Sequence, residues 1–113
     1  MTSRVRIQEA AIQRLDDIYQ YGVRQWGANQ SEDYLLGLFA TFDKIADHQV
    51  ASRPIPAEFG VQGYYYRYRK HMVYWKTLRT GGIGIVTVLH EKMHQITRFQ
   101  DDFNLMTNQT DTD

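Results

Sequence analysis

The chain has 113 residues, of which 42% are hydrophobic, and its 13 basic and 13 acidic side chains give a net charge of zero. This length is enough for one hydrophobic core and too short for two, so we expect one domain. The absence of cysteine excludes a disulfide framework and a thiolate zinc site. No apolar run reaches the roughly eighteen residues of a membrane-spanning helix, and none forms a signal segment at the amino terminus, which favours a cytoplasmic protein.

Charge is distributed unevenly along the chain. Residues 1–61 hold six basic and eight acidic side chains, residues 62–98 hold seven basic and one acidic, and residues 99–113 hold four acidic and no basic. A basic segment of this kind suggests an anionic partner, which can be a protein, a nucleic acid or a phosphate group. The alternative interpretation, of equal weight, is a basic face that is simply solvated.

The first part of the chain predicts a short strand and a helix. Residues 4–7 alternate between arginine and an aliphatic side chain, as in a strand. Residues 8–26 then follow a period of 3.6 and carry two adjoining apolar stripes. These stripes consist of Ala11, Leu15, Ile18 and Gly22, and of Ile12, Tyr19, Val23 and Trp26. We expect one stripe to pack on a sheet and the other on a second helix, with Gly27 ending the first helix.

A second helix is predicted over residues 30–48. Asn29 followed by Glu32 is close to a capping box, which marks a helix start. The main apolar stripe of this helix consists of Leu35, Leu38, Phe42 and Ile45. Two helices joined by a few residues form an antiparallel hairpin. Residues 49–61, which contain both prolines, are expected to form an irregular crossover.

Residues 62–94 predict a three-stranded antiparallel meander. Three runs rich in aromatic and β-branched residues are separated by polar breaks at Lys70-His71 and Thr80–Gly82. If side chains alternate along the first run, the tyrosines at positions 64, 66 and 68 point one way. Tyr65, Arg67 and Arg69 then point the other way.

The element order β-α-α-β-β-β predicts a two-layer α+β domain, in which the N-terminal strand joins an antiparallel sheet and the helical hairpin covers one sheet face. We expect this single domain to occupy residues 1–103. Residues 104–113 are acidic and polar, and are predicted to be a disordered tail.

Several segments together resemble the ParE/RelE superfamily of bacterial toxins. They are residues 11–21 of the first helix, Trp26-Gly27, Tyr34-Leu35, residues 45–48, Gly63, residues 71–75, residues 85–90 and Met93. The resemblance covers roughly residues 4–94, and the Val88-Leu89-His90 segment favours the ParE branch. It implies a RelE/ParE-like fold and the toxin of a type II toxin–antitoxin module.

The resemblance implies two possible activities. ParE-like members inhibit DNA gyrase by binding it, and a cognate ParD-like antitoxin neutralises them in a hetero-oligomer. RelE-like members instead cleave mRNA on the ribosome, as metal-independent endoribonucleases. We favour the gyrase inhibitor and therefore expect no catalytic residue, no metal and no cofactor.

Each of the two possible activities predicts a set of site residues. The target-binding surface is predicted to consist of Arg67, Arg69, Lys76, Arg79, Lys92 and Arg98. The antitoxin-binding surface is predicted to consist of Leu15, Tyr19, Trp26, Leu35, Phe39 and Phe42. For a ribonuclease, the general acid, the general base and the cations would come from His90, His94, Arg67 and Arg69. The hairpin register, which the sequence leaves open, decides whether Lys76 joins the arginines.

Overall fold

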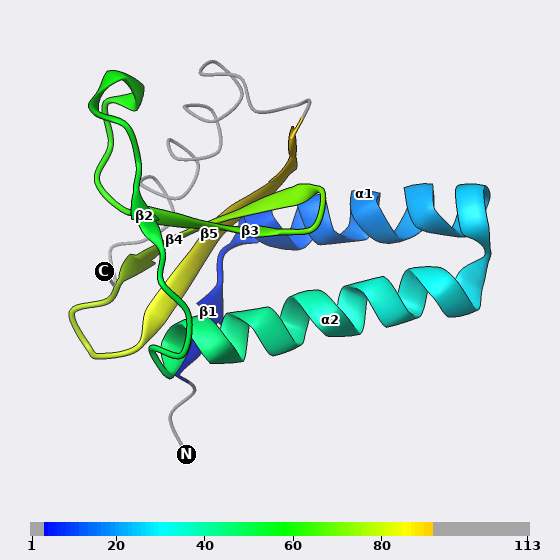
Figure 1. Cartoon of the computed structure of the whole chain (residues 1–113), viewed down its shortest axis with the longest axis horizontal. Helices are drawn as coiled ribbons and strands as arrows, with labels where there is room; N and C mark the ends of the chain where they lie inside the picture. The colour runs from blue at the N-terminus through cyan, green and yellow to red at the C-terminus, as the bar shows by residue number, and fades with distance from the viewer. Residues whose placement is uncertain (1–3, 92–113) are drawn as a thin grey trace.

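The computed structural model of the chain describes residues 4–91, except for the side chain of Phe59. Its elements are β1 (Val5–Ile7), α1 (Glu9–Trp26), α2 (Ala28–Ala46), β2 (Arg53–Pro54), a short 3₁₀ helix (Ala57–Phe59), β3 (Tyr64–Tyr68), β4 (His71–Thr77) and β5 (Ile83–His90). The two helices lie side by side against the sheet, and their far ends project beyond it (Figure 1). The predicted α+β architecture is therefore confirmed. Neither described helix has a stretch apolar enough, over sufficient length, to cross a membrane.

The five strands form one mixed sheet in the order β1-β5-β4-β3-β2. The predicted meander is present, because β3 pairs antiparallel with β4, and β4 pairs antiparallel with β5. β1 lies at the edge and runs parallel to β5. The crossover, predicted to be irregular, contributes the two-residue strand β2, which pairs with the start of β3.

The connection between the helices is shorter than the sequence suggested. α1 ends at Trp26 and α2 begins at Ala28, so Gly27 alone joins them, with a φ of +94° that favours glycine. The predicted capping box at Asn29 and Glu32 is wrong, because Asn29 already lies inside the first turn of α2. No side-chain hydrogen bond caps α2, and the single glycine leaves no room for a separate capping residue.

The sheet buries side chains on both of its faces. The larger cluster lies between the helices and the sheet; its buried members are Ala11, Leu15, Leu38, Phe42, Ile45, Val73, Trp75, Ile83, Ile85 and Val88. The smaller cluster lies on the opposite face; its buried members are Ile55, Tyr74, Val86 and Leu89. The first predicted stripe of α1 packs into the core, whereas Ile12 and Trp26 of the second stripe are largely exposed. The expectation that both stripes are covered is therefore wrong.

A β-bulge in β5 changes which residues share a face. Tyr74 pairs with Thr87 while its neighbour Trp75 pairs with Ile85, so Val86 is the extra residue. As a result Ile85 and Val88 both belong to the cluster under the helices, although strict alternation would separate them. The bulge also places the end of β5, including His90, on the face that the helices cover.

Replacing Gly22 by alanine is expected to destabilise the protein by about 1–3 kcal/mol, because the added methyl group overpacks the contact between the helices. A Cβ at this position would lie 2.4 Å from Oγ of Ser31 and 2.9 Å from its Cβ. The Ser31 hydroxyl also donates a hydrogen bond of 2.8 Å to the carbonyl of Tyr19. The overpacking is expected to exceed the roughly 1 kcal/mol that alanine contributes through helix propensity.

Urea unfolding of Gly22→Ala and of the double variant Gly22→Ala/Ser31→Gly measures this effect. Removal of the Ser31 side chain makes room for the methyl group, so the double variant is expected to recover part of the lost stability. A Gly22→Ala protein as stable as the parent would contradict the close packing of α1 on α2.

Candidate functional site at the β3–β4 turn

The site is built around the turn that joins β3 to β4. Tyr68 and His71 close the hairpin as a cross-strand pair, so Arg69 and Lys70 form the turn. Arg69 has a φ of +52°, an uncommon value for a residue other than glycine. His71 lies opposite His90 on the next strand. The turn therefore begins one residue earlier than the predicted break at Lys70-His71.

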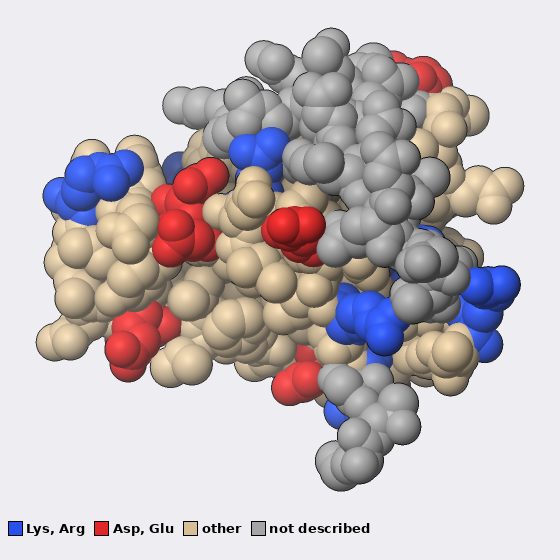
Figure 2. Space-filling view, turned by 180° about the vertical axis from the view of Figure 1, so that it is seen from behind, with Lys and Arg blue, Asp and Glu red and all other residues tan. Residues whose placement is uncertain are grey.

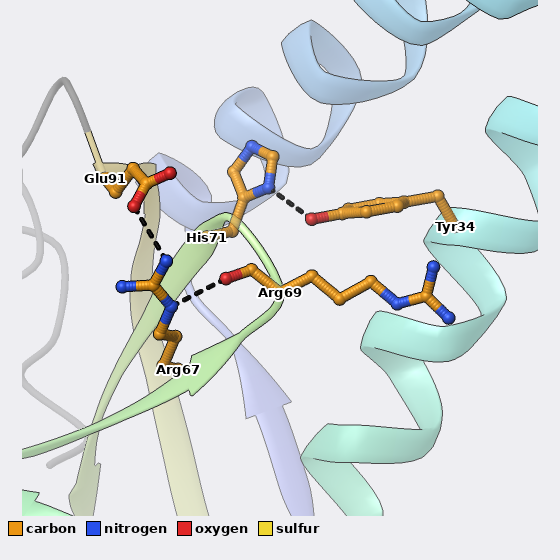
Figure 3. Close-up of polar contacts among 5 residues, drawn as sticks. All are labelled: Tyr34, Arg67, Arg69, His71 and Glu91. Carbon is orange, nitrogen blue, oxygen red and sulfur yellow. Dashed lines mark hydrogen bonds and ion pairs between the residues drawn. The ribbon is translucent and has the colours of Figure 1, made fainter.

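Aromatic and basic groups gather on the helix side of this turn. The Tyr34 hydroxyl, from α2, lies 2.7 Å from Nδ1 of His71, and the His71 ring meets the His90 ring edge-on at 5.2 Å between centroids. The guanidinium carbon of Arg69 lies 5.9 Å from the Tyr34 ring centroid and 5.4 Å from that of Tyr68. In Figure 3 the Arg69 side chain extends towards α2 beside Tyr34.

Arg67 makes a separate set of contacts. Its Nη2 lies 2.7 Å from a carboxylate oxygen of Glu91, and its Nε donates a hydrogen bond of 2.7 Å to the carbonyl of Arg69. Both side chains of the ion pair are partly exposed to water, so its contribution to stability is small, about 0–1 kcal/mol. The pair nevertheless holds the Arg67 guanidinium at the end of β5 (Figure 3).

The prediction that Arg67 and Arg69 share a face is wrong. Alternation holds only within a strand, and β3 ends at Tyr68. Arg69 is the first turn residue, and its positive φ redirects the side chain to the helix side. Arg67 follows Tyr65 on the opposite face, where it reaches Glu91. The two guanidinium groups therefore lie on opposite sides of the hairpin.

Burial changes the proton affinity of this cluster. Burial, followed by the nearby His90, lowers the pKa of His71 from 6.5 to about 4, so its imidazole is neutral at pH 7. Burial also raises the pKa of the Tyr34 hydroxyl, which remains protonated. The hydrogen bond from Arg67 holds the pKa of Glu91 below its usual value. His71 is thus a hydrogen-bonding group at neutral pH rather than a cation.

Stability is expected to fall by about 2 kcal/mol between pH 6.5 and pH 4 through His71 alone. The unfolded chain binds a proton at His71 below pH 6.5, whereas the folded chain does so only near pH 4. The contribution of His71 to the free energy of unfolding is therefore complete above pH 6.5 and is lost as the pH falls. The expected loss is smaller than the pKa shift alone would give, because the ring is only partly buried. Urea unfolding at pH 7 and pH 4.5 measures the change. His71→Phe has no proton to bind and should show a smaller change over this range; an equal change would contradict the assignment.

The predicted target-binding residues occupy two ends of the sheet. Lys76 shares the face of Met72 and Tyr74 by alternation, but it lies four residues, or about 13 Å, along β4 from Met72, the partner of Arg67. It lines a hollow of about 520 Å³ beneath the crossover. Arg79 is exposed in the turn after β4, at the same end as Lys76. The expected single basic surface is therefore divided, and the predicted residues Lys92 and Arg98 lie outside the described residues.

The residues predicted for a ribonuclease do not converge in the described part of the chain. His90 and Arg69 lie on the helix side of the sheet end, Arg67 lies on the other side, and His94 is outside the described residues. Sequence reasoning missed His71 and Tyr34, which complete the helix-side cluster. The pairing of His71 with His90 depends on the bulge at Val86, which the sequence does not reveal, and no local signal connects Tyr34 to either histidine.

The predicted antitoxin-binding residues divide into core and surface. Leu15 and Phe42 are only 6% and 2% exposed and belong to the core under the helices, so their assignment to a binding surface is wrong. Each lies on the stripe of its own helix that faces the sheet and the other helix. The structure leaves Trp26 59% exposed and Phe39 37% exposed. The remaining two residues, Tyr19 and Leu35, are half-buried.

The helices and the β3–β4 turn differ in charge. α1 and α2 together carry six acidic and three basic side chains. Seen from behind, acidic side chains lie along the helical hairpin, which extends to the left of that view (Figure 2). The β3–β4 turn instead exposes Arg67, Arg69 and Lys70. In residues 4–91, no three His, Asp or Glu side chains form a group that could hold a metal ion.

Comparison with known proteins identifies the family. Residues 5–95 match the family described as the ParE toxin of the type II toxin–antitoxin system parDE. The chain is 33% identical over 92 residues to Toxin ParE1 of Caulobacter vibrioides, and this match covers 79% of the chain and 90% of that protein. The family match includes the helical hairpin and the meander, as the fold leads one to expect. The chain therefore belongs to the family of ParE toxins of type II toxin–antitoxin systems.

Proposed function

We propose that this toxin inhibits DNA gyrase by binding it through the β3–β4 turn, and that a ParD-like antitoxin neutralises it by covering the helical hairpin. The observation that carries the proposal is the basic turn itself. Arg67, Arg69 and Lys70 are exposed there within four consecutive residues. A turn with cations on both sides fits an acidic recess on a protein partner, where each guanidinium meets a separate carboxylate.

The geometry favours binding over catalysis at this site. Cleavage of RNA needs an acid, a base and cations that converge on one phosphate. Here Arg67 and Arg69 diverge, and His71 is partly buried in its neutral form, in contact with Tyr34 and His90. A binding surface has no such requirement, because each charge contributes wherever the partner offers its complement.

A ribosome-dependent endoribonuclease is the second candidate. The observation that favours it is the pair of histidines on the helix side, since the ring centroids of His71 and His90 lie 5.2 Å apart. Only an imidazole with a pKa near neutrality serves as an acid–base group at pH 7. The low pKa of His71 makes it a poor candidate for this role.

The proposed antitoxin surface is the partly exposed flank of the helical hairpin beside its sheet-facing side. Tyr34 marks the sheet-facing side of α2, and Leu35 lies about 100° further round the helix. Phe39 lies one turn along from Leu35, while Trp26 is exposed at the end of α1. Aromatic side chains at such a surface are typical binding hot spots. Because the helices are acidic, a helical antitoxin segment with both apolar and basic residues fits them.

Gyrase supercoiling and ribosome-associated mRNA cleavage separate the two activities. We expect purified toxin to inhibit supercoiling of relaxed plasmid, and we expect equimolar antitoxin to abolish the inhibition. We also expect mRNA in a translation extract to remain intact when the toxin is added. Unimpaired supercoiling together with cut messages would contradict the proposal and favour the nuclease.

A further inference from the structure

We propose that Tyr34 is a positioning residue for the toxic surface: its ring carries the Arg69 guanidinium and its hydroxyl holds His71, so that α2 sets where the β3–β4 turn presents its cations. This inference rests on the proposed function, in which that turn binds the target. The geometry supports it at two points. The Tyr34 hydroxyl is 2.7 Å from Nδ1 of His71, and the Tyr34 ring centroid is 5.9 Å from the guanidinium carbon of Arg69.

The hydrogen bonds of the Tyr34 hydroxyl define the state of His71. The main chain of Lys70 also hydrogen-bonds with this hydroxyl, and a main-chain N–H at that position can only donate. A hydroxyl that donates its proton to Nδ1 of His71 while it accepts from Lys70 satisfies both contacts, and this is the arrangement we expect. A neutral His71 then carries its proton on Nε2. One hydroxyl thus contacts Lys70, the second residue of the turn, and His71, the residue that follows it.

The Tyr34 ring restrains a side chain that would otherwise be mobile. Arg69 lies in a turn, is exposed and has several rotatable bonds. Its guanidinium lies beside two rings, since it is also 5.4 Å from the ring of Tyr68. The rings of Tyr34 and Tyr68 contact each other edge-on at 5.3 Å between centroids. A restrained cation loses less entropy when it binds a partner, which is the benefit of pre-organisation.

The glycine at position 37 of α2 is a second, independent indication that the turn packs against this helix. Gly37 lies three residues after Tyr34 and therefore on the same side of the helix. A Cβ at Gly37 would lie 2.0 Å from the Tyr68 hydroxyl oxygen. The absence of a side chain at this position allows Tyr68 to lie against the helix, and Tyr68 in turn supports Arg69. Tyr34 and Gly37 together form the part of α2 against which the β3–β4 turn packs.

Three full-length variants test the proposal. Tyr34→Phe keeps the ring and removes the hydroxyl, Tyr34→Leu removes both functions, and Tyr21→Leu alters an exposed tyrosine of α1 as the control. We expect supercoiling inhibition and growth arrest to weaken at least tenfold in Tyr34→Leu, which corresponds to about 1.4 kcal/mol. Tyr34→Phe should lose two- to fivefold, and Tyr21→Leu less than twofold.

Nuclear magnetic resonance distinguishes positioning from general loss of structure. In the parent protein, ring currents should shift the Arg69 side-chain protons upfield, and the ¹⁵N shifts of His71 should report a proton on Nε2. Tyr34→Phe should keep the Arg69 shifts and lose the single His71 tautomer, whereas Tyr34→Leu should lose both. Backbone spectra that remain dispersed in all three variants would show that the fold is retained.

Different results overturn the inference and the proposed function. Full toxicity in Tyr34→Leu, with the upfield Arg69 shifts lost, would show that positioning by Tyr34 does not matter. Unshifted Arg69 protons in the parent protein would contradict the geometry directly. Growth arrest without gyrase inhibition would contradict the gyrase target only, because the growth assay would still report the effect of Tyr34.

Discussion

Replacing Arg67 and Arg69 together by glutamate is expected to abolish toxicity. The two guanidinium groups are the exposed cations on either side of the β3–β4 turn, and the change replaces two positive by two negative charges there. An acidic partner that meets this turn would then be repelled, and juxtaposed like charges at an interface are unfavourable by several kcal/mol. Growth after induced expression, and supercoiling by purified gyrase, measure the effect.

Antitoxin affinity should remain within about tenfold in the same double variant, or about 1.4 kcal/mol, because the proposed antitoxin surface lies on the helices. The matched control is Arg24→Glu/Lys44→Glu, which makes the same change in net charge at exposed positions of α1 and α2. This control should remain toxic. Toxicity that survives the change at Arg67 and Arg69 would exclude the turn as the toxic surface.

The single variants carry further information because the two arginines diverge. Arg67→Glu also places a carboxylate next to Glu91, so it removes the ion pair at the end of β5. Arg69→Glu removes the cation that lies beside the rings of Tyr34 and Tyr68. If the partner surrounds the turn, each single variant should weaken inhibition. A loss confined to one of them would identify which side of the hairpin faces the partner.

Phe42→Ala is expected to destabilise the protein by about 3–5 kcal/mol, since the side chain is only 2% exposed and its removal leaves a cavity under the helices. A domain of this size commonly has a free energy of unfolding of about 5–15 kcal/mol, so the loss is a large share. Urea unfolding measures it. A change below about 1 kcal/mol would contradict the placement of Phe42 in the core.

Phe39→Ala is the matched variant one turn earlier on α2. Its ring contacts that of Phe42 at 5.9 Å, but it is 37% exposed, so we expect a loss of stability of less than about 1.5 kcal/mol. We expect antitoxin affinity to fall at least tenfold instead, as for an interface anchor. Titration calorimetry with the antitoxin measures this; unchanged affinity would remove Phe39 from the antitoxin surface.

The regular parts of the fold were predictable because local patterns encode them. The helical period of residues 8–26 gave α1 almost to the residue, and the aromatic and β-branched runs gave β3, β4 and β5. The start of α2 was not predictable from the Asn29–Glu32 pattern, because a single glycine joins the helices. Capping signals describe isolated helices, whereas the geometry of a tight hairpin overrides them.

The candidate site was predictable only in part. The basic character of the β3–β4 region is visible in the sequence, and so is the position of His90 at the end of the last strand. Tyr34 lies 37 residues from His71, and nothing in the sequence marks it as the partner of that histidine. Leu15 and Phe42 were assigned to the surface because a helical stripe alone does not reveal which of its members the sheet covers.

The sequence by itself determined the family, the order of the elements and the concentration of cations near one hairpin, since each depends on residue type and local spacing. Only the tertiary structure decided on which face of the sheet these side chains lie. The φ of +52° at Arg69 turned that side chain towards α2, and the bulge at Val86 brought His90 to the side of His71. Alternation along a strand fails wherever a turn or a bulge interrupts it, and the packing of distant elements decides where such an interruption is stable.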